Sequence, residues 1–345
     1  MARVLTRTAV PTTRAVAPVL VSTAALGVVL VAATSVGSVW VGPGALLSAV
    51  GDGVRGQVHG TVDTIVWQLR VPRVLLAALV GAALALAGAA FQGVFRNPLA
   101  DPYLLGAASG AGFGASAVLV LAGSVPWLTR LGVPGAAFVC ALATVAAVMV
   151  LARRDGGLPA VSLILAGVVL GSSLSAGTSF LMLAARDRAA GILSWLLGSF
   201  AFASWERVLS VAPLFLPAAA VLLLAGRALD VMQLGEESAA QLGVPVERVR
   251  LALLVAATLA TAAAVAVAGV IGFVGLVVPH AVRLAFGPRH VRLLPLAAVW
   301  GAIFLVLADL FARTVLAPAE LPVGIVTALV GGPFFLLLLR RQHAR

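Results

Sequence analysis

Long apolar runs alternate with short polar interruptions along nearly the whole chain. A helix needs about 20 predominantly apolar residues to cross a bilayer, so these runs predict about ten membrane-spanning helices. They fall at residues 15–40, 71–92, 103–121, 133–151, 158–184, 208–227, 251–269, 272–284, 293–316 and 322–340. The pattern therefore predicts an all-α polytopic membrane protein, with one membrane domain at 15–340 between short tails at 1–14 and 341–345.

One interruption, RNPLADP from Arg96 to Pro102, places charge and two prolines between two apolar runs. Helix-breaking backbone of this kind is not tolerated in contact with lipid, because its polar groups would be unsatisfied there. We therefore expect an ordered polar loop at the end of the second span.

A longer interruption, residues 228–250, is too charged to cross a membrane and is patterned like two short helices. Glu236 and Glu237 would lie in a first helical turn, and Gly243 would cap its C-terminus. Pro245 would then occupy the first position of a second helix. A small hairpin projecting from the membrane suits the docking of a partner, whereas the alternative is a solvated surface loop.

Small residues recur at four-residue spacing in two predicted spans. They are Gly106, Gly110 and Gly114 in the third, and Gly167, Gly171, Ser175 and Ser179 in the fifth. Such spacing allows helix backbones to approach closely. Tight packing and a smooth face lining a wide pathway are both compatible with it.

The composition excludes several classes of protein. With 62% hydrophobic and 10% charged residues, the chain is far from the average soluble domain. Its 23 basic residues are all Arg, so it lacks the Lys that a Walker A site places on nucleotide phosphates. The arginines are scattered rather than gathered on one face, which argues against nucleic acid. No His, Cys or carboxylate group has metal-ligand spacing, so we expect neither a metal site nor enzymatic activity.

The distribution of Arg predicts the orientation in the membrane. Ten crossings place both termini on the same side, and assigning alternate loops gives 15 Arg to that side and 8 to the other. Because the loops richer in Arg remain cytoplasmic, both termini are predicted to be cytoplasmic.

Asp309 is the one acidic residue that this assignment places inside a span, and intramembrane carboxylates are functional candidates by default. Arg313 follows four residues later, where the two side chains can pair along one helix face. A structural pair is therefore one interpretation. The other is an ion-coupled secondary transporter with Asp309 as its coupling site.

Several long motifs resemble those of the FecCD-type permeases of ABC importers, which carry vitamin B12, haem and ferric siderophores. They are RVPR (70–73), GAALALAGAAFQGVFRNPLADPYLLG (81–106), LILAGVVL (163–170), LGEESAAQLGV (234–244), GFVGLVVPHAVRL (272–284) and DLFARTVLAPAELPVGIVTALVGGPFF (309–335). The resemblance implies the type II ABC importer permease fold in the bacterial plasma membrane. It also implies a second permease subunit, identical or different, two cytoplasmic ATPase subunits and an extracytoplasmic substrate-binding protein. The implied substrate is a metal chelate, with a ferric siderophore as first choice before haem or cobalamin.

The resemblance also implies roles for particular residues. ATPase docking falls on Leu234, Gly235, Glu236, Glu237, Gln241, Leu242 and Gly243. The cytoplasmic gate falls on Asn97, Leu99 and Ser162, and docking of the binding protein on Arg70, Arg73 and Arg313. Membrane-interface snorkelling is the alternative for the three arginines. No cofactor is expected on this chain, because ATP and Mg would be used by the partner ATPase.

Overall fold

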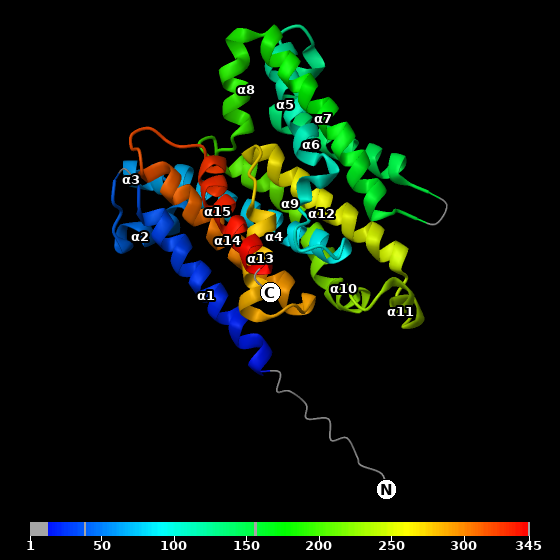
Figure 1. Cartoon of the computed structure of the whole chain (residues 1–345). Helices are drawn as coiled ribbons and strands as arrows, with labels where there is room; N and C mark the ends of the chain where they lie inside the picture. Colours follow the sequence, from blue (N-terminus) through cyan, green and yellow to red (C-terminus); the bar gives the residue numbers. More distant parts are fainter. Residues whose placement is uncertain (1–12, 38, 155–156, 344–345) are drawn as a thin grey trace.

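The computed structural model describes residues 13–37, 39–154 and 157–343 (Figure 1). Its long helices are α1 (Thr13–Ser35), α4 (Val71–Val94), α5 (Ala107–Leu121), α6 (Pro126–Ala152), α7 (Ala160–Ala184), α9 (Trp205–Leu224), α12 (Val246–Ala268), α13 (Val274–Phe286), α14 (His290–Thr314) and α15 (Val323–His343). Its short helical segments are α2 (Pro43–Val54), α3 (Thr61–Asp63), η1 (Thr64–Arg70), η2 (Pro102–Leu105), η3 (Arg186–Arg188), α8 (Ala189–Leu196), α10 (Gly226–Met232) and α11 (Glu236–Gln241).

The predicted all-α membrane fold is confirmed. In the described part of the chain, seven helices are long and apolar enough to cross a membrane, and α5, α13 and α15 are shorter apolar helices. These ten helices coincide with the ten predicted spans, with ends that differ by a few residues. The same part of the chain contains no β-strand.

Helix α4 is the centre of the bundle. It packs against α14, α12, α13 and α9 (Figure 1), and its side chains are buried along nearly all of its length. Glycine allows the closest of these contacts. A Cβ atom on Gly81 would overlap the Gly301 carbonyl of α14, and one on Gly88 would overlap the backbone of Gly275 in α13. Such approaches replace hydrophobic driving force, which is weak between helices surrounded by lipid.

Helices α5, α6 and α7 form a second packed group beside this centre (Figure 1). Cβ atoms on Gly110 and Gly114 would collide with α6, at Thr144 and at the Ala136 carbonyl respectively, and one on Gly167 would collide with Leu104 in η2. These three glycines are therefore packing positions, and the pathway interpretation, which is compatible with packing, stays a prediction. Ser175 and Ser179 differ from them, because both side chains are exposed on α7.

Several short elements were absent from the sequence prediction. The stretch between the first two predicted spans contains α2, whose Leu46 and Ala49 pack against Val41 and Val66. The π-helical turn η1 then continues directly into α4. Helix α8 follows α7 in the stretch between the fifth and sixth predicted spans.

The interruption at 228–250 is also organised differently from the expected hairpin of two helices. It contains α10 and α11, and Val246 begins the spanning helix α12 itself, with Pro245 as its N-cap. Gly243 does adopt the left-handed conformation expected of a C-terminal cap, with φ +83°.

Candidate functional site

The docking segment, residues 226–250 from α10 to the start of α12, carries the predicted ATPase-docking residues. Glu236 and Glu237 lie in the first turn of α11 as predicted, where carboxylates favour the positive end of the helix dipole. Leu234 and Leu242 flank the helix with 66% and 65% of their surface exposed. Glu236, Glu237, Gln241 and Gly243 are exposed as well, and Gly235 is half-buried.

Arg250 fastens α11 to the membrane bundle. Its guanidinium forms one ion pair with Glu236 and a second with Glu247, the latter at 2.7 Å between Nη1 and Oε1. The Arg250 side chain is only 10% exposed. Glu236 is thus an internal anchor, and Glu237 is the first-turn carboxylate with no ion pair among the described residues.

Helix α10 is fastened to the same bundle by hydrogen bonds. The Asp230 carboxylate accepts from the His290 backbone N–H at 2.6 Å and lies 3.0 Å from His290 Nδ1, so it caps the N-terminus of α14. Gln233 Nε2 donates to the Gly93 carbonyl at the end of α4 at 3.0 Å. A displacement of α10 would therefore move the C-terminal end of α4 and the N-terminal end of α14.

The RNPLADP stretch forms the predicted ordered loop. The Asn97 side chain accepts a hydrogen bond from the Leu99 N–H at 2.9 Å, and Asp101 caps η2 by accepting from the Tyr103 N–H at 2.8 Å. Burial raises the pKa of the Asp101 carboxyl to about 6, and the hydrogen bond from Tyr103 opposes part of that rise. Arg96 begins the loop with a positive φ of 48°.

The predicted gate residues occupy different surroundings. Leu99 lines a crevice too narrow for water, together with His280 of α13 and Phe334 of α15. Asn97 is exposed, and Ser162 lies half-buried in the first turn of α7. Their role in a gate stays a prediction, since these contacts alone do not define an opening.

A cavity of about 390 Å³ lies where the start of the loop, the start of α7 and the docking segment meet. Its lining includes Arg96 from the loop, Ala160 from α7, and Glu236, Glu247 and Arg250 from the docking segment. The predicted docking and gate regions are therefore neighbours, although Glu236 and Arg96 are 140 residues apart in the sequence.

A buried polar network that the sequence prediction missed joins α4 to α13. Gln92 Nε2 donates to the carbonyls of Gly275 and Leu276, each at 3.3 Å, and Gln92 Oε1 accepts from Arg283 Nη2 at 2.9 Å. Gln92 itself was the signal in the sequence that could have revealed this network. A polar side chain within an apolar membrane helix is uncommon unless it has hydrogen-bond partners inside the bundle.

Replacing Gln92 by Leu is expected to destabilise the protein by about 1–3 kcal/mol, because the half-buried guanidinium of Arg283 loses the side-chain oxygen to which it donates. Thermal unfolding of the detergent-solubilised protein measures this change. Gln233→Leu, which removes a less buried amide, is the matched control and should cost less. An unfolding midpoint for Gln92→Leu equal to that of the original chain would contradict the role of this network.

The three arginines expected to receive a binding protein are largely buried and bonded within the chain. Arg70 donates to the carbonyls of Thr34, Ser35 and Val39, and Arg313 donates to the carbonyl of Ala33. The carbonyls of Ala33, Thr34 and Ser35 belong to the last turn of α1. The two guanidiniums therefore neutralise the negative end of the α1 dipole. Neither presents an open fork to an external carboxylate in this structure.

The predicted pair of Asp309 with Arg313 is present as a long contact, but the principal partner of Asp309 is Arg73. Arg73 donates three hydrogen bonds to Asp309 at 2.8–3.1 Å, whereas Arg313 Nε lies 3.9 Å from it and forms only a long ion pair. Arg73 also contacts Glu320 at 2.9 and 3.0 Å. The pairing with Arg73 was hidden because 236 residues separate the two partners.

Comparisons with known proteins agree with this architecture. The model of the FecCD transport family matches residues 25–341. The cobalamin import system permease protein BtuC of Halobacterium salinarum is 43% identical over 84% of this chain and 76% of its own length. The hemin transport system permease protein HmuU of Yersinia pestis is 45% identical over 81% of this chain and 84% of its own.

A solved structure is also similar over almost the whole chain. It is described as an inward-facing conformation of a metal-chelate type ABC transporter, and it superposes with a TM-score of 0.82 at 31% identity. The match covers 94% of this chain and 99% of the solved one. The resemblance inferred from the motifs is thereby confirmed at the level of sequence and of fold.

Proposed function

The chain belongs to the FecCD transport family of ABC transporter permeases, and from that premise we propose that it forms the translocation pathway of an importer whose energy comes from separate ATPase subunits. The exposed surface of α11 carries this proposal. It combines two exposed leucines with the carboxylate of Glu237, and exposed apolar side chains rimmed by polar ones mark protein interaction sites. We infer that the ATPase docks here.

The anchoring of the docking segment gives the proposal a mechanism. Movement of α11 would displace Arg250, through its ion pair with Glu236, and with it the start of α12. Movement of α10 would displace the end of α4 through Gln233 and the start of α14 through Asp230. These residues lead to α12, α4 and α14, and α4 ends at the RNPLADP loop. ATP-driven motion of the partner would thus reach the predicted gate through hydrogen bonds and ion pairs rather than through a flexible tether.

The remaining assembly is proposed from the family. A second permease subunit, two ATPases and an extracytoplasmic binding protein would complete the importer, with both termini of this chain in the cytoplasm. The buried arginines add one condition for the binding protein. A carboxylate from that protein would reach Arg73 only by displacing Glu320, whose side chain is 40% exposed.

The proposed substrate is a bulky metal chelate, with a ferric siderophore first and haem or cobalamin as the other candidates. Reported relatives are named for cobalamin and hemin, which are both large chelates of a single metal ion. Uptake of labelled ferric siderophore, haem and cobalamin by cells expressing the complete importer would rank them. Uptake of none of the three would contradict the substrate class.

Co-purification of the tagged chain in mild detergent tests the docking surface. We expect an ATPase in stoichiometric amount with the original chain, and loss of most of it when Glu237→Arg is combined with Leu242→Asp. Both residues are exposed, so the fold should survive, and Glu206→Arg on the exposed start of α9 is the matched control. Undiminished recovery of the ATPase with the double variant would exclude α11 as the docking surface.

A further inference from the structure

An apolar groove runs along one side of α12 and has an arginine at one end. Its volume is about 450 Å³, and its lining is almost entirely hydrocarbon. The lining residues are Pro217, Ala218 and Val221 of α9 and Arg248, Leu251, Ala252, Val255, Ala256 and Leu259 of α12. The positions on α12 recur every three or four residues, so they form one continuous stripe of the helix.

The length of this groove matches one leaflet of a bilayer. At 1.5 Å per residue, the stripe from Arg248 to Leu259 rises roughly 16 Å. The hydrocarbon core of a bilayer is roughly 30 Å thick, so one acyl chain extends over about the same distance from the interface to the midplane. Val221, Leu251 and Val255 are 42–52% exposed along the groove, which leaves their apolar surface open to such a chain.

Arg248 stands at the mouth of the groove with its charge unneutralised. It is exposed, and no carboxylate of the described residues lies within ion-pair distance of it. The adjacent Glu247 is held by Arg250 at 2.7 Å on the other side. An arginine here can keep its aliphatic stem on the apolar stripe while its guanidinium reaches the interface.

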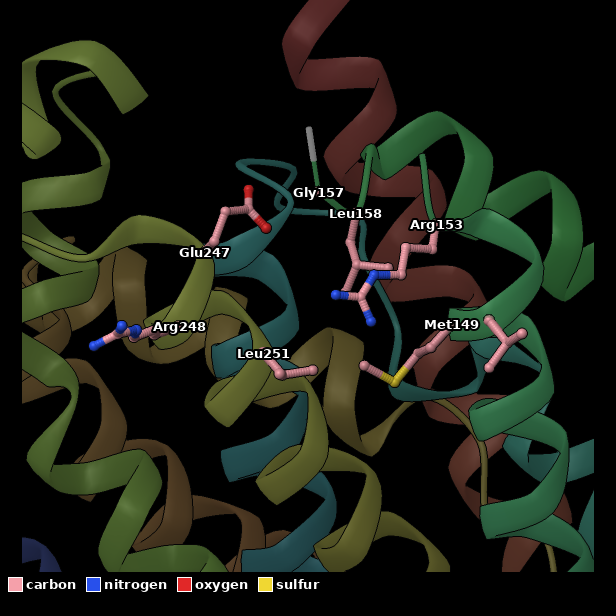
Figure 2. Close-up of a pocket in the computed structure, with 8 residues that line it drawn as sticks. Met149, Arg153, Gly157, Leu158, Glu247, Arg248 and Leu251 are labelled. Atoms are coloured by element: carbon pink, nitrogen blue, oxygen red, sulfur yellow. The ribbon is translucent and has the colours of Figure 1, made fainter. Parts of the chain in front are cut away.

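A second cavity beside the mouth brings another arginine to this end of α12, and the carboxylate of Glu247 lines it as well. It has a volume of about 300 Å³, lies between α6 and α12, and also includes Arg248 in its lining. Figure 2 shows the Arg153 side chain reaching from the end of α6 into this cavity, whereas the Arg248 side chain extends away from it, past the other side of α12. Two arginines therefore flank the beginning of α12 at the same end of the membrane bundle.

We propose that the groove between α9 and α12 binds an anionic phospholipid. One acyl chain lies along Leu251, Ala252 and Val255, and the phosphate is bound by Arg248. Arginines at the membrane surface attract anionic headgroups, and the planar guanidinium fork matches phosphate geometry. This site does not depend on the proposed transport function, because it needs only the membrane position of α9 and α12.

Thermal unfolding of the full chain in uncharged detergent tests the proposal. Phosphatidylglycerol should raise the unfolding midpoint by several degrees more than phosphatidylcholine does, because a ligand of the folded state stabilises it in proportion to its occupancy. Inorganic phosphate alone should have no such effect. Arg248→Gln should weaken the apparent affinity for phosphatidylglycerol roughly fivefold, and the exposed Arg289→Gln, at the start of α14, should leave it unchanged.

A second variant tests the acyl chain without altering charge. Ala252→Phe would fill the groove at an exposed position and should also remove the preference for phosphatidylglycerol. Equal stabilisation of the original chain by the two lipids would overturn the proposal. So would an unchanged affinity in both Arg248→Gln and Ala252→Phe, or a full effect of inorganic phosphate.

Discussion

Replacing Asp309 by Ala should lower the free energy of unfolding by about 3–5 kcal/mol, because it leaves two arginines in the bundle without their buried counter-ion. Asp309 is 2% exposed and receives three hydrogen bonds from Arg73. Its loss would also release the contact with Arg313 and thereby disturb the end of α1. The yield of folded protein and the unfolding midpoint in detergent measure the effect.

Glu320→Gln is the matched control for this prediction. Glu320 binds the same guanidinium, but its side chain is 40% exposed, and exposed ion pairs contribute about 0–1 kcal/mol. The variant Asp309→Asn separates the structural role from ion coupling. A stable, fully assembled Asp309→Asn protein that has lost transport would contradict the structural account and favour the secondary transporter.

Gly88→Ala should destabilise the bundle by about 3 kcal/mol, the upper end of the usual cost of overpacking. The added Cβ would overlap the backbone of Gly275, and a backbone atom cannot move aside as a flexible side chain does. Helices α4 and α13 would have to separate, which would also stretch the hydrogen bonds from Gln92 to Gly275 and Leu276.

Gly27→Ala provides the control for this substitution. Gly27 lies in α1 with no atom within 4 Å of its added Cβ, so the higher helix propensity of Ala should leave stability unchanged or slightly increased. Unfolding midpoints of the two variants, measured side by side, separate steric from intrinsic effects. Equal midpoints would show that α4 and α13 can separate without cost.

The positions of the spans were predictable because bilayer thickness imposes a length on each apolar run. The short helices that do not cross the membrane were not predictable in this way. Helix α2 contains Gly44, Gly51 and Gly53 and forms where its apolar face meets Val66, which is tertiary information. Helix α8, with eight residues, is too short to give a span signal.

The docking segment was predictable in part because local rules govern it. First-turn carboxylates and a left-handed glycine identified α11. The second predicted short helix is instead the beginning of the membrane helix α12, because the helix that starts at Val246 continues into the apolar stretch that follows. The principal partner of Asp309 was not predictable. The sequence offers Arg313 at helical spacing, but the position of Arg73 beside Asp309 depends on how α4 packs against α14.

Transport by the assembled complex is the most direct test of the central claim. The tagged chain would be purified with its partner ATPase and binding protein, reconstituted into vesicles, and assayed for uptake of a labelled metal chelate with and without Mg-ATP. We expect uptake that requires Mg-ATP and is lost in the Glu237→Arg, Leu242→Asp double variant. Uptake by this chain alone, driven by an ion gradient without ATP, would contradict the role of this chain as an importer subunit powered by a partner ATPase.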